Sequence, residues 1–409
     1  TASYQLITSN LATLTGIFGK HSLSGIVGAE FQTVNNSNFI SGGNLIPDET
    51  YILNNAAVPY ITGGYKSATA FNSYFSQADY NYDGKYFAVG SFRSDGSSVF
   101  GPSHKYGNFY SLGASWLLNK EKFLTDSKTI SLLKARFSYA TVGNSGLNSP
   151  SPYFGGYSYS SGSLPGYFGS GAPANIGYNN QPSAYPVKPT NNNLSWEVNK
   201  TINAGVDLGL FKRVTVNIDA YKRINSGLLQ QVPFQATSGF TSNIINTGKV
   251  QNRGLELNLN SMNIQRKDFS WDMNFNITFN RNKVISLAGH NDVYQSANIN
   301  YKQDLITSEG HDLYSFLLLN YRGVDPTTGN ALFEQWQDNN GNVISTAANN
   351  GKAIKPAKVT TTTDPSKATL EYFGGFFPKF NAGFYNEFKY KNFGFSFLIY
   401  SVYGNKTYN

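Results

Sequence analysis

The sequence has 409 residues and no cysteine, and 14% of its residues are charged while 15% are aromatic. Without cysteine the chain can form no disulfide, zinc–thiolate site or thiol nucleophile. Its formal net charge of +8 comes from basic residues spread singly along the chain, so the clustered basic patch that nucleic-acid binding requires is not predicted.

Apolar and polar residues alternate in segment after segment, and this period of two predicts β-strands with one apolar and one polar face. In chain order the clearest segments are 133–139, 202–208, 214–220, 255–260, 269–280, 380–389 and 393–399. In segment 269–280 the apolar face consists of Trp271, Met273, Phe275, Ile277 and Phe279. The polar face consists of Ser270, Asp272, Asn274, Asn276, Thr278 and Asn280. No uninterrupted apolar run reaches the ~18 residues of a transmembrane helix.

The connections between these segments are of two kinds. Short, charged turns are predicted at 19–21, 83–85, 211–213, 265–267 and 390–392, with a longer one at 119–131 that includes a helical turn at 120–124. Long connections rich in Gly, Asn, Ser, Tyr and Pro are predicted at 34–65, 94–106, 143–194, 226–244, 282–306 and 325–376. Hairpins with short turns at one end and long loops at the other are typical of outer-membrane barrels.

We therefore predict an all-β chain that forms a transmembrane antiparallel β-barrel with about twelve strands in these residues. The apolar face would meet lipid tails, and the polar face would line a water-filled or plugged lumen. The alternative is a large soluble β-sandwich or β-solenoid, in which the apolar face would be a core. Long loops confined to one end of long strands disfavour that alternative.

Several segments carry motifs that are specific in combination and order. They are YFAVGSFRSDGSSVFGPSHKYGNFYSLGASWLLNKEKFL (86–124), LKARFSYATVGNSG (133–146), LSWEVNKTINAGVDLGL (194–210), INTGKVQNRGLELNLN (245–260), NYRGVDPTTGNALFE (320–334) and FFPKFNAGFYNEFKYKNFGFSFLIYSVYGNKTYN (376–409). In these segments the chain resembles the SusC family, also called RagA-like, of TonB-dependent outer-membrane transporters of Bacteroidetes. Tyr106 and Tyr110 stand where that family commonly has Trp and Pro.

The resemblance implies a fold with an N-terminal plug, a TonB box and about 22 strands around the plugged lumen. Residues 1–409 would be part of the transmembrane barrel domain, because neither plug nor TonB box is present in this sequence. The first residues already have a strand-like pattern, so we expect the chain to belong to a longer polypeptide. Two open edges of such a partial barrel would need the rest of the polypeptide to close them.

By resemblance, the predicted function is TonB-dependent import of oligomeric nutrients across the Gram-negative outer membrane. The substrate would be a glycan or an oligopeptide, and the partners would be outer-membrane lipid, a SusD-like surface lipoprotein, and TonB through a segment outside this chain. The alternatives are a passive outer-membrane channel, a barrel scaffold in another membrane complex, and a secreted β-rich adhesin. No nucleic-acid partner and no cofactor are predicted.

Residues 151–186, within the long connection 143–194, interleave aromatic side chains with Gly, Ser and Pro. Such rings stack on sugars or peptides, and surfaces rich in Tyr, Ser and Gly bind adaptably. Packing on neighbouring loops over the barrel mouth is an equally good explanation, and the loop could also meet the SusD-like lipoprotein. The candidate ligand- or partner-contacting residues are Tyr153, Phe154, Tyr157, Tyr159, Tyr167, Phe168, Tyr178 and Tyr185.

Other motifs favour structure over chemistry. Residues 95–98 (DGSS) are interpreted as a turn in which Asp-Gly supplies a positive φ, and residues 338–344 (DNNGNVI) as an Asn/Gly turn rather than a calcium loop, because the bidentate acid is missing. The four histidines lie far apart, so neither a metal site nor a catalytic residue is predicted and the chain is not expected to be an enzyme. Lumen-facing charges are expected to pair across strands or touch the plug; they are Lys134, Arg136, Asp207, Asp219, Glu256, Asp272, Glu387 and Lys389.

Overall fold

The computed structural model describes residues 1–44, 58–146, 156–160, 183–288, 293–295, 305–346, 348–349 and 352–407. Within these ranges almost every regular element is a β-strand. The helical elements among them are single 3₁₀ turns, η2 (Leu118–Lys120), η5 (Ala236–Ser238) and η7 (Pro365–Lys367). No described helix is long and apolar enough to cross a bilayer.

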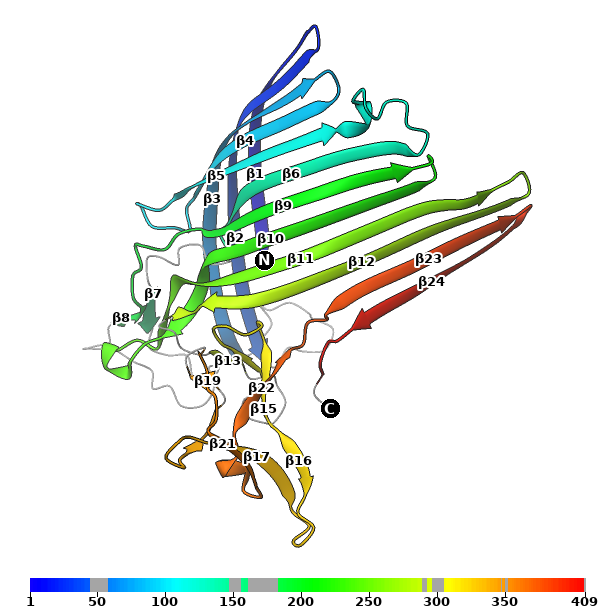
Figure 1. The fold of residues 1–409 in the computed structure, drawn as a ribbon. Helices are drawn as coiled ribbons and strands as arrows, with labels where there is room; N and C mark the ends of the chain where they lie inside the picture. The colour runs from blue at the N-terminus through cyan, green and yellow to red at the C-terminus, as the bar shows by residue number, and fades with distance from the viewer. Residues whose placement is uncertain are drawn as a thin grey trace.

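Twelve strands form one antiparallel sheet that curves into a single wall (Figure 1). The order across the wall is β1-β2-β3-β4-β5-β6-β9-β10-β11-β12-β23-β24. The strands are β1 (Ala2–Phe18), β2 (His21–Asn44), β3 (Val58–Tyr82), β4 (Tyr86–Ser97), β5 (Tyr106–Leu117), β6 (Ile130–Asn144), β9 (Glu197–Leu210), β10 (Val214–Pro233), β11 (Ser242–Gln265), β12 (Phe269–Ser286), β23 (Phe380–Tyr390) and β24 (Phe393–Tyr403). The predicted antiparallel sheet of about twelve strands is confirmed. Its edges are β1 and β24, which pair only with β2 and β23 among the described strands.

Chain neighbours are sheet neighbours except at two places, where an insertion leaves the wall. Between β6 and β9 lies a ribbon of β7 (Gly156–Ser160) and β8 (Ser183–Lys188). Between β12 and β23 lies an external module of small sheets, at the bottom of Figure 1. Its strands are β13 (Val293–Gln295), β14 (Leu305–Thr307), β15 (Ser315–Leu319), β16 (Tyr321–Val324), β17 (Ala331–Gln337), β18 (Val343–Ile344), β19 (Ala348–Asn349), β20 (Lys352–Ala353), β21 (Lys358–Thr362) and β22 (Leu370–Gly375).

The short turns lie where the sequence predicted them, and two of them have two consecutive residues with left-handed backbones. Asp83 and Gly84 have φ of 54° and 61°, and Phe211 and Lys212 have φ of 53° and 52°. Two consecutive positive φ angles are typical of type I′ hairpin turns, whose twist matches that of the flanking strands. The connection 119–131 also turns as predicted, although its 3₁₀ element begins at Leu118, earlier than the predicted helical turn.

Each of the six predicted long connections contains strand residues, and three of these predictions are wrong by the largest extent. Much of 34–65 and of 226–244 is strand, because β2 and β3 have 24 and 25 residues and β10 and β11 have 20 and 24. At roughly 3.3 Å per residue, 25 residues extend about 80 Å, far beyond the ~30 Å hydrocarbon layer. Connection 325–376, predicted as a loop, contains the strands β17–β22.

The prediction that residues 95–98 (DGSS) form a turn with a positive φ at Gly96 is also wrong. Gly96 lies inside β4 opposite Tyr106, and it is absent from the described residues with a positive φ. A Cβ at Gly96 would lie 2.6 Å from Cε1 of Tyr106, so the glycine makes room for that ring. The backbone N–H of Ala70 on β3 donates a hydrogen bond to Oγ of Ser98, which ties the end of this segment to the neighbouring strand.

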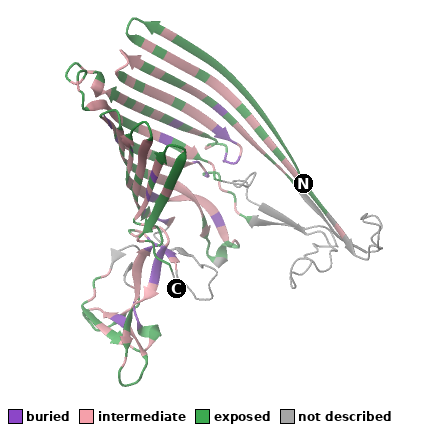
Figure 2. Cartoon of the chain, turned by 90° about the vertical axis from the view of Figure 1, so that its right-hand side faces the viewer, coloured by how far each residue is buried: buried purple, intermediate pink, exposed green. Residues whose placement is uncertain are grey.

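Few side chains are buried, and Figure 2 shows strands banded with exposed and intermediate residues. The larger buried cluster lies at the loop end of the wall, where Trp196 contacts Phe100 and Phe109 with ring centroids 5.1 Å and 5.6 Å apart. Val99 and Leu194 complete the buried part of this cluster, which we term the loop-end core. Many other large apolar side chains of the strands are exposed, as those of a lipid-facing surface would be.

Candidate functional site: the polar lumen wall

The register of the sheet gathers the predicted polar positions on one face. Asn258 lies opposite Asn276, and Asn260 lies opposite Asn274. The amide of Asn274 donates to the carbonyl oxygens of both Asn258 and Asn260, and Asn276 donates to Asn274 over 3.4 Å. We term this polar side the lumen face, and its amides are exposed enough to exchange partners with water or a ligand.

Arg136 is the centre of the strongest polar cluster on the lumen face. Its Nε and Nη2 donate to the two carboxylate oxygens of Asp207 over 3.0 Å and 2.8 Å. Its Nη1 and Nη2 also donate to Asp219, both over 2.9 Å. The amide of Asn217 donates to Asp207 as well. One guanidinium therefore ties β6, β9 and β10 together.

Space for this cluster comes from Gly205, which lies directly opposite both Arg136 and Asp219. A Cβ at that position would lie 2.5 Å from Oδ1 of Asp219 and 2.8 Å from Nη2 of Arg136. The missing side chain lets the guanidinium lie across the strand and reach carboxylates on two neighbours.

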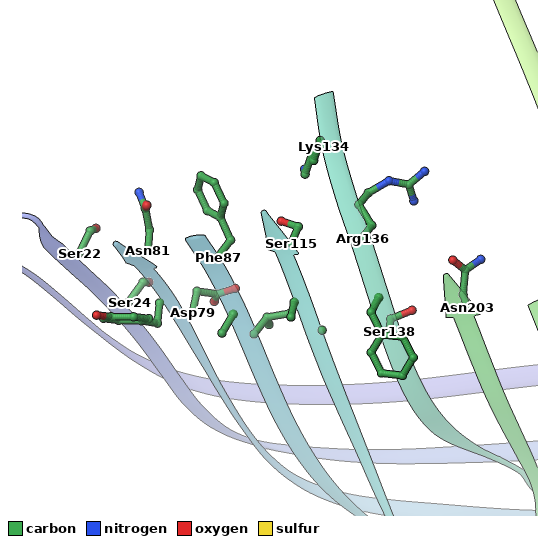
Figure 3. A pocket seen from close by; sticks show the side chains of 16 residues that line it. Ser22, Ser24, Asp79, Asn81, Phe87, Ser115, Lys134, Arg136, Ser138 and Asn203 are labelled. Atoms are coloured by element: carbon green, nitrogen blue, oxygen red, sulfur yellow. The ribbon is translucent and has the colours of Figure 1, made fainter. Parts of the chain in front are cut away.

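A hollow of about 450 Å³ lies beside this cluster (Figure 3). Its lumen-side lining combines hydroxyls, amides and charges of both signs, namely Ser24, Asp79, Asn81, Lys134, Arg136, Ser138 and Asn203. Donors and acceptors of this kind suit a polyhydroxylated or peptide-like chain. Among the described residues no His, Asp and Glu gather into a metal-binding group.

The predicted pairing of lumen charges is confirmed for part of the set. Arg136 pairs across strands with Asp207 and Asp219, whereas Lys389 pairs with Glu387 on its own strand over 2.8 Å. Lys134 lines the hollow without an ion pair among the described residues. The sequence did not single out Asn217, Asn203 or Tyr221, whose hydroxyl donates to Asn280 over 3.2 Å. The only indication in the sequence was that they occupy the polar positions of strands in which polar and apolar residues alternate.

The predicted aromatic candidates lie partly outside the described residues. Tyr153, Phe154, Tyr167, Phe168 and Tyr178 are outside the described ranges. Tyr157 and Tyr159 lie on β7, and Tyr185 lies on β8 opposite Ser158. These three therefore share a two-stranded ribbon that leaves the wall between β6 and β9. Ligand or partner contact by the eight residues stays a prediction.

The segment 338–344 is a turn, in agreement with its predicted role. Oδ1 of Asp338 accepts hydrogen bonds from the backbone N–H groups of Asn340 and Asn342, both over 2.8 Å. Gly341 supplies a φ of 81°. Hydrogen bonds from Asn342, first from its side chain, hold the pKa of Asp338 below its usual range. The carboxylate is thus committed to the backbone of its own turn.

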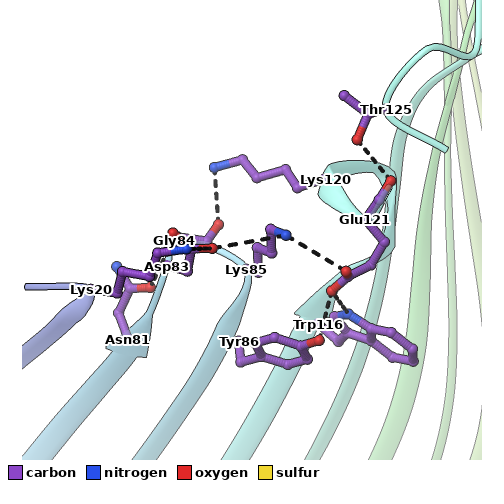
Figure 4. Close-up of polar contacts among 10 residues, drawn as sticks. All are labelled: Lys20, Asn81, Asp83, Gly84, Lys85, Tyr86, Trp116, Lys120, Glu121 and Thr125. Atoms are coloured by element: carbon purple, nitrogen blue, oxygen red, sulfur yellow. Dashed lines mark hydrogen bonds and ion pairs between the residues drawn. The ribbon is translucent and has the colours of Figure 1, made fainter. Parts of the chain in front are cut away.

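The short-turn end of the wall carries a second polar cluster (Figure 4). Glu121 accepts hydrogen bonds from the Tyr86 hydroxyl over 2.7 Å and from Nε1 of Trp116 over 3.1 Å. These bonds, first that of Tyr86, hold the pKa of Glu121 below its usual range. The rings of Tyr86 and Trp116 stack with centroids 5.9 Å apart. Such amphipathic aromatics are typical of the boundary between lipid and water.

A pair of carboxylates joins two of the small sheets of the external module, the one that contains β17 and the one that contains β22. Asn320 donates through Nδ2 to Glu334 over 3.1 Å and to Glu371 over 3.3 Å. Glu334 also accepts from Nε of Arg322 and from Nε1 of Trp336. Burial raises the pKa of Glu371, and the charge of Glu334 raises it further. This cluster could not be predicted from the sequence, because its members are separated along the chain.

Replacing Glu371 by glutamine is expected to stabilise the external module at neutral pH. An acid whose pKa is raised in the folded state favours folding when it is protonated, at pH values below its unfolded pKa of about 4.3. This contribution is lost as the pH rises through the pKa of the folded state, whereas a neutral glutamine keeps it. After correction for intrinsic rates, amides of β17 and β22 should therefore exchange more slowly at pH 7 in E371Q than in the parent, with the difference shrinking toward pH 4.

Asp364→Asn is the control of opposite sign, because hydrogen bonds from Ser366 lower the pKa of Asp364. That variant should exchange faster than the parent at pH 7. A difference for E371Q that is absent at pH 7 or grows toward acid would contradict the raised pKa of Glu371.

A curved antiparallel wall with an apolar outer face, a hydrogen-bonding inner face, and connections that are short at one end and long at the other defines an outer-membrane β-barrel. Residues 2–386 match the family described as TonB dependent receptor-like, beta-barrel. The chain belongs to that family, which consists of receptors rather than enzymes, as the sequence predicted.

The relatives support the predicted SusC and RagA resemblance. The chain is 30% identical to TonB-dependent receptor P3 of Formosa agariphila over 98% of this chain and 39% of that protein. It is 28% identical to TonB-dependent receptor SusC of Bacteroides thetaiotaomicron over 84% of this chain and 32% of that protein. A chain of the RagAB peptide importer in the open-open state superposes with a TM-score of 0.78 at 23% identity, covering 98% of this chain and 40% of that one. The wall is thus part of a larger barrel.

Proposed function

We propose that this wall belongs to a TonB-dependent importer that carries oligomeric nutrients across the outer membrane. The observation that most supports this role is the lumen face, where the hydrogen-bonded amides around Asn274 and the Arg136 cluster present many donors and acceptors along a polar path. A chain of linked sugars or amino acids would exchange its hydrogen bonds with water for bonds with such groups. The substrate class is a glycan or an oligopeptide.

The import role requires a closed barrel, because lipid offers no partners for open strand edges. β1 and β24 are the two edges of the described sheet, and all but one residue of each strand is exposed. Further strands of the same barrel therefore cover both edges. The fraction of its relatives that this chain spans, 39% for receptor P3, agrees with this arrangement.

A surface lipoprotein of the SusD type is the proposed partner at the external mouth. Similarity to SusC and to a chain of the RagAB peptide importer supports this assignment. The β7–β8 ribbon and the external module extend from the loop end of the wall, where such a partner would dock (Figure 1). The eight candidate aromatics would contact that partner or the incoming ligand, and TonB would engage a segment outside these residues.

Uptake by cells that express the intact protein tests this function. Labelled oligosaccharides and oligopeptides should be supplied to strains with and without TonB, each compared with a strain that lacks the protein. Import lost with either TonB or the protein would support the proposal, and the labelled class taken up would identify the substrate. Uptake that persists without TonB would instead indicate a passive channel.

Mass spectrometry of the intact polypeptide purified from outer membranes provides an independent test. A mass that accommodates a plug and a TonB box upstream of these residues is expected. A mature protein that carries neither would contradict active import and favour a channel or scaffold.

A further inference from the structure

Three basic side chains lie directly opposite one another on three adjacent strands. Lys222 of β10 pairs in register with Arg253 of β11, and Arg253 pairs with Arg281 of β12. We term these residues the external basic row. Like charges directly opposite across a ladder destabilise a sheet, and two strand spacings of about 4.8 Å hold all three within about 10 Å. The arrangement therefore needs a compensating anion.

The row continues the outer, lipid-facing side of the wall. One step closer to the short turns, the same face carries Ala220, Leu255 and Phe279, and the step before that carries Ile218, Leu257 and Ile277. The pairing is regular throughout these positions, so no bulge changes the face. The cations therefore stand where the apolar surface ends, on the side of the long connections.

More positive charge lies one step further out, and little negative charge accompanies it. Lys283 follows on β12, opposite Gln251. Arg253, Arg281 and Lys283 line a hollow of about 540 Å³ together with Ile285 and the carboxylate of Asp312. Within the described ranges, none of these cations has an ion pair. Arg281 instead donates through Nη1 to the backbone carbonyls of Asn280 and Lys379, which fixes its guanidinium.

The charge is local to these strands. At the same level β9 has Ile202 opposite Lys222, and β6 has Tyr139 opposite Ile202. A general belt of surface lysines would not leave these neighbours apolar.

We propose that the external basic row binds the phosphate groups of a phosphorylated lipid in the outer leaflet. Arginine presents a planar fork that matches phosphate oxygens, and such charge-assisted bonds are stronger than neutral ones. The acyl chains of the same lipid would lie on the apolar surface formed by Leu255, Phe279 and their neighbours. Continuity with that surface favours a lipid over a soluble anion. This site is separate from the lumen face and needs no particular imported substrate.

The test uses the intact protein, purified in mild detergent and mixed with lipid A, with lipid bound per protein measured by native mass spectrometry. Arg253→Gln and the double variant R253Q/R281Q should bind lipid A about tenfold or more weakly than the parent, equivalent to about 1.4 kcal/mol. Binding by the parent should also weaken as ionic strength rises.

Arg223→Gln is the matched control. It removes the same charge from β10, next to Lys222 in sequence, but Arg223 lies opposite Asn252 on the lumen face. R223Q should retain the affinity of the parent, and R253K/R281K, which keeps the charge without the fork, should be intermediate. If the double variant fails to fold, the single variant R253Q decides the question.

Three outcomes would overturn the proposal. The first is lipid A binding by R253Q or R253Q/R281Q that equals the parent's, and the second is an equal loss of binding in R223Q. The third is displacement of lipid A by an equal concentration of inorganic phosphate, which would identify the ligand as a free anion rather than a lipid headgroup.

Discussion

Replacing Trp196 by alanine is expected to lower the free energy of local opening at the loop end of the wall by about 3–5 kcal/mol, the usual loss of stability on truncating a buried tryptophan. Trp196 is 8% exposed, contacts Phe100 and Phe109, and donates through Nε1 to the carbonyl of Lys105 over 3.0 Å. The variant loses this packing and leaves that carbonyl without its donor. The loop-end core therefore holds β5 against the connection that follows β4 and the connection that precedes β9.

Amide exchange in the intact protein measures this opening locally. Amides near residues 97–106 and 191–197 should exchange roughly a hundredfold faster or more in W196A, since each 1.4 kcal/mol is a factor of ten. Phe100→Ala should have a similar effect, because Phe100 is fully buried in the same core. Phe123→Ala is the control, since Phe123 is 69% exposed and should change stability by no more than about 0.5 kcal/mol. Unchanged exchange in W196A would contradict this account of the core.

Replacing Arg136 by methionine is expected to destabilise the wall by about 2–3 kcal/mol. Removing one partner of a buried ion pair costs about 3–5 kcal/mol because the remaining charge has no compensation. The cost here is lower because the Arg136 side chain is 30% exposed and water reaches it. Asp207 and Asp219, which are diagonal neighbours on β9 and β10, would lose the cation they share, so β6, β9 and β10 should lose stability together.

The midpoint of guanidinium unfolding of the intact protein in detergent measures the effect. R136K should be intermediate, because an ammonium lacks the fork that reaches both carboxylates. The triple variant R136M/D207N/D219N should recover much of the loss, since it removes all three charges. Lys389→Ala is the control, because its ion pair with Glu387 is exposed to solvent and should contribute little to stability. An R136M midpoint equal to that of K389A would show that the Arg136 cluster stabilises the wall no more than an exposed ion pair does.

The sequence predicted the wall because the alternation of apolar and polar residues is a local pattern. It is stable in a barrel wall, since one face meets lipid and the other meets the polar lumen. Every position named on the apolar face of segment 269–280 lies on one side of β12, and the Asn positions lie on the other. The short turns were equally predictable, since they combine charge with residues such as Asp83 and Gly84.

Strand length was less predictable than strand position. Residues 34–44 are rich in Asn, Ser and Gly, which are depleted in strands. They nevertheless continue β2, because β3 already lies beside them and pairs with them as far as Asn44. Backbone pairing thus overrode local preference once the register had been set.

The Arg136 cluster shows why a correct set of residues did not give the correct contacts. The residue directly opposite Asp207 on β6 is Lys134, whereas Arg136 lies opposite Gly205. Arg136 reaches Asp207 along the diagonal because Gly205 leaves room. That geometry depends on register and on an absent side chain, and neither is visible in the alternation.

The most direct test of the central claim is a cysteine scan of residues 273–279 in the intact protein in native outer membranes. Residues 1–409 contain no cysteine, so once every cysteine outside them has been replaced by serine, each single-cysteine variant reports on one position only. The account predicts a period of two: Met273, Phe275, Ile277 and Phe279 should contact a lipid-soluble quencher and resist a water-soluble maleimide, while the intervening positions should do the reverse. Accessibility that fails to alternate, or that alternates with the opposite phase, would contradict a lipid-facing barrel wall.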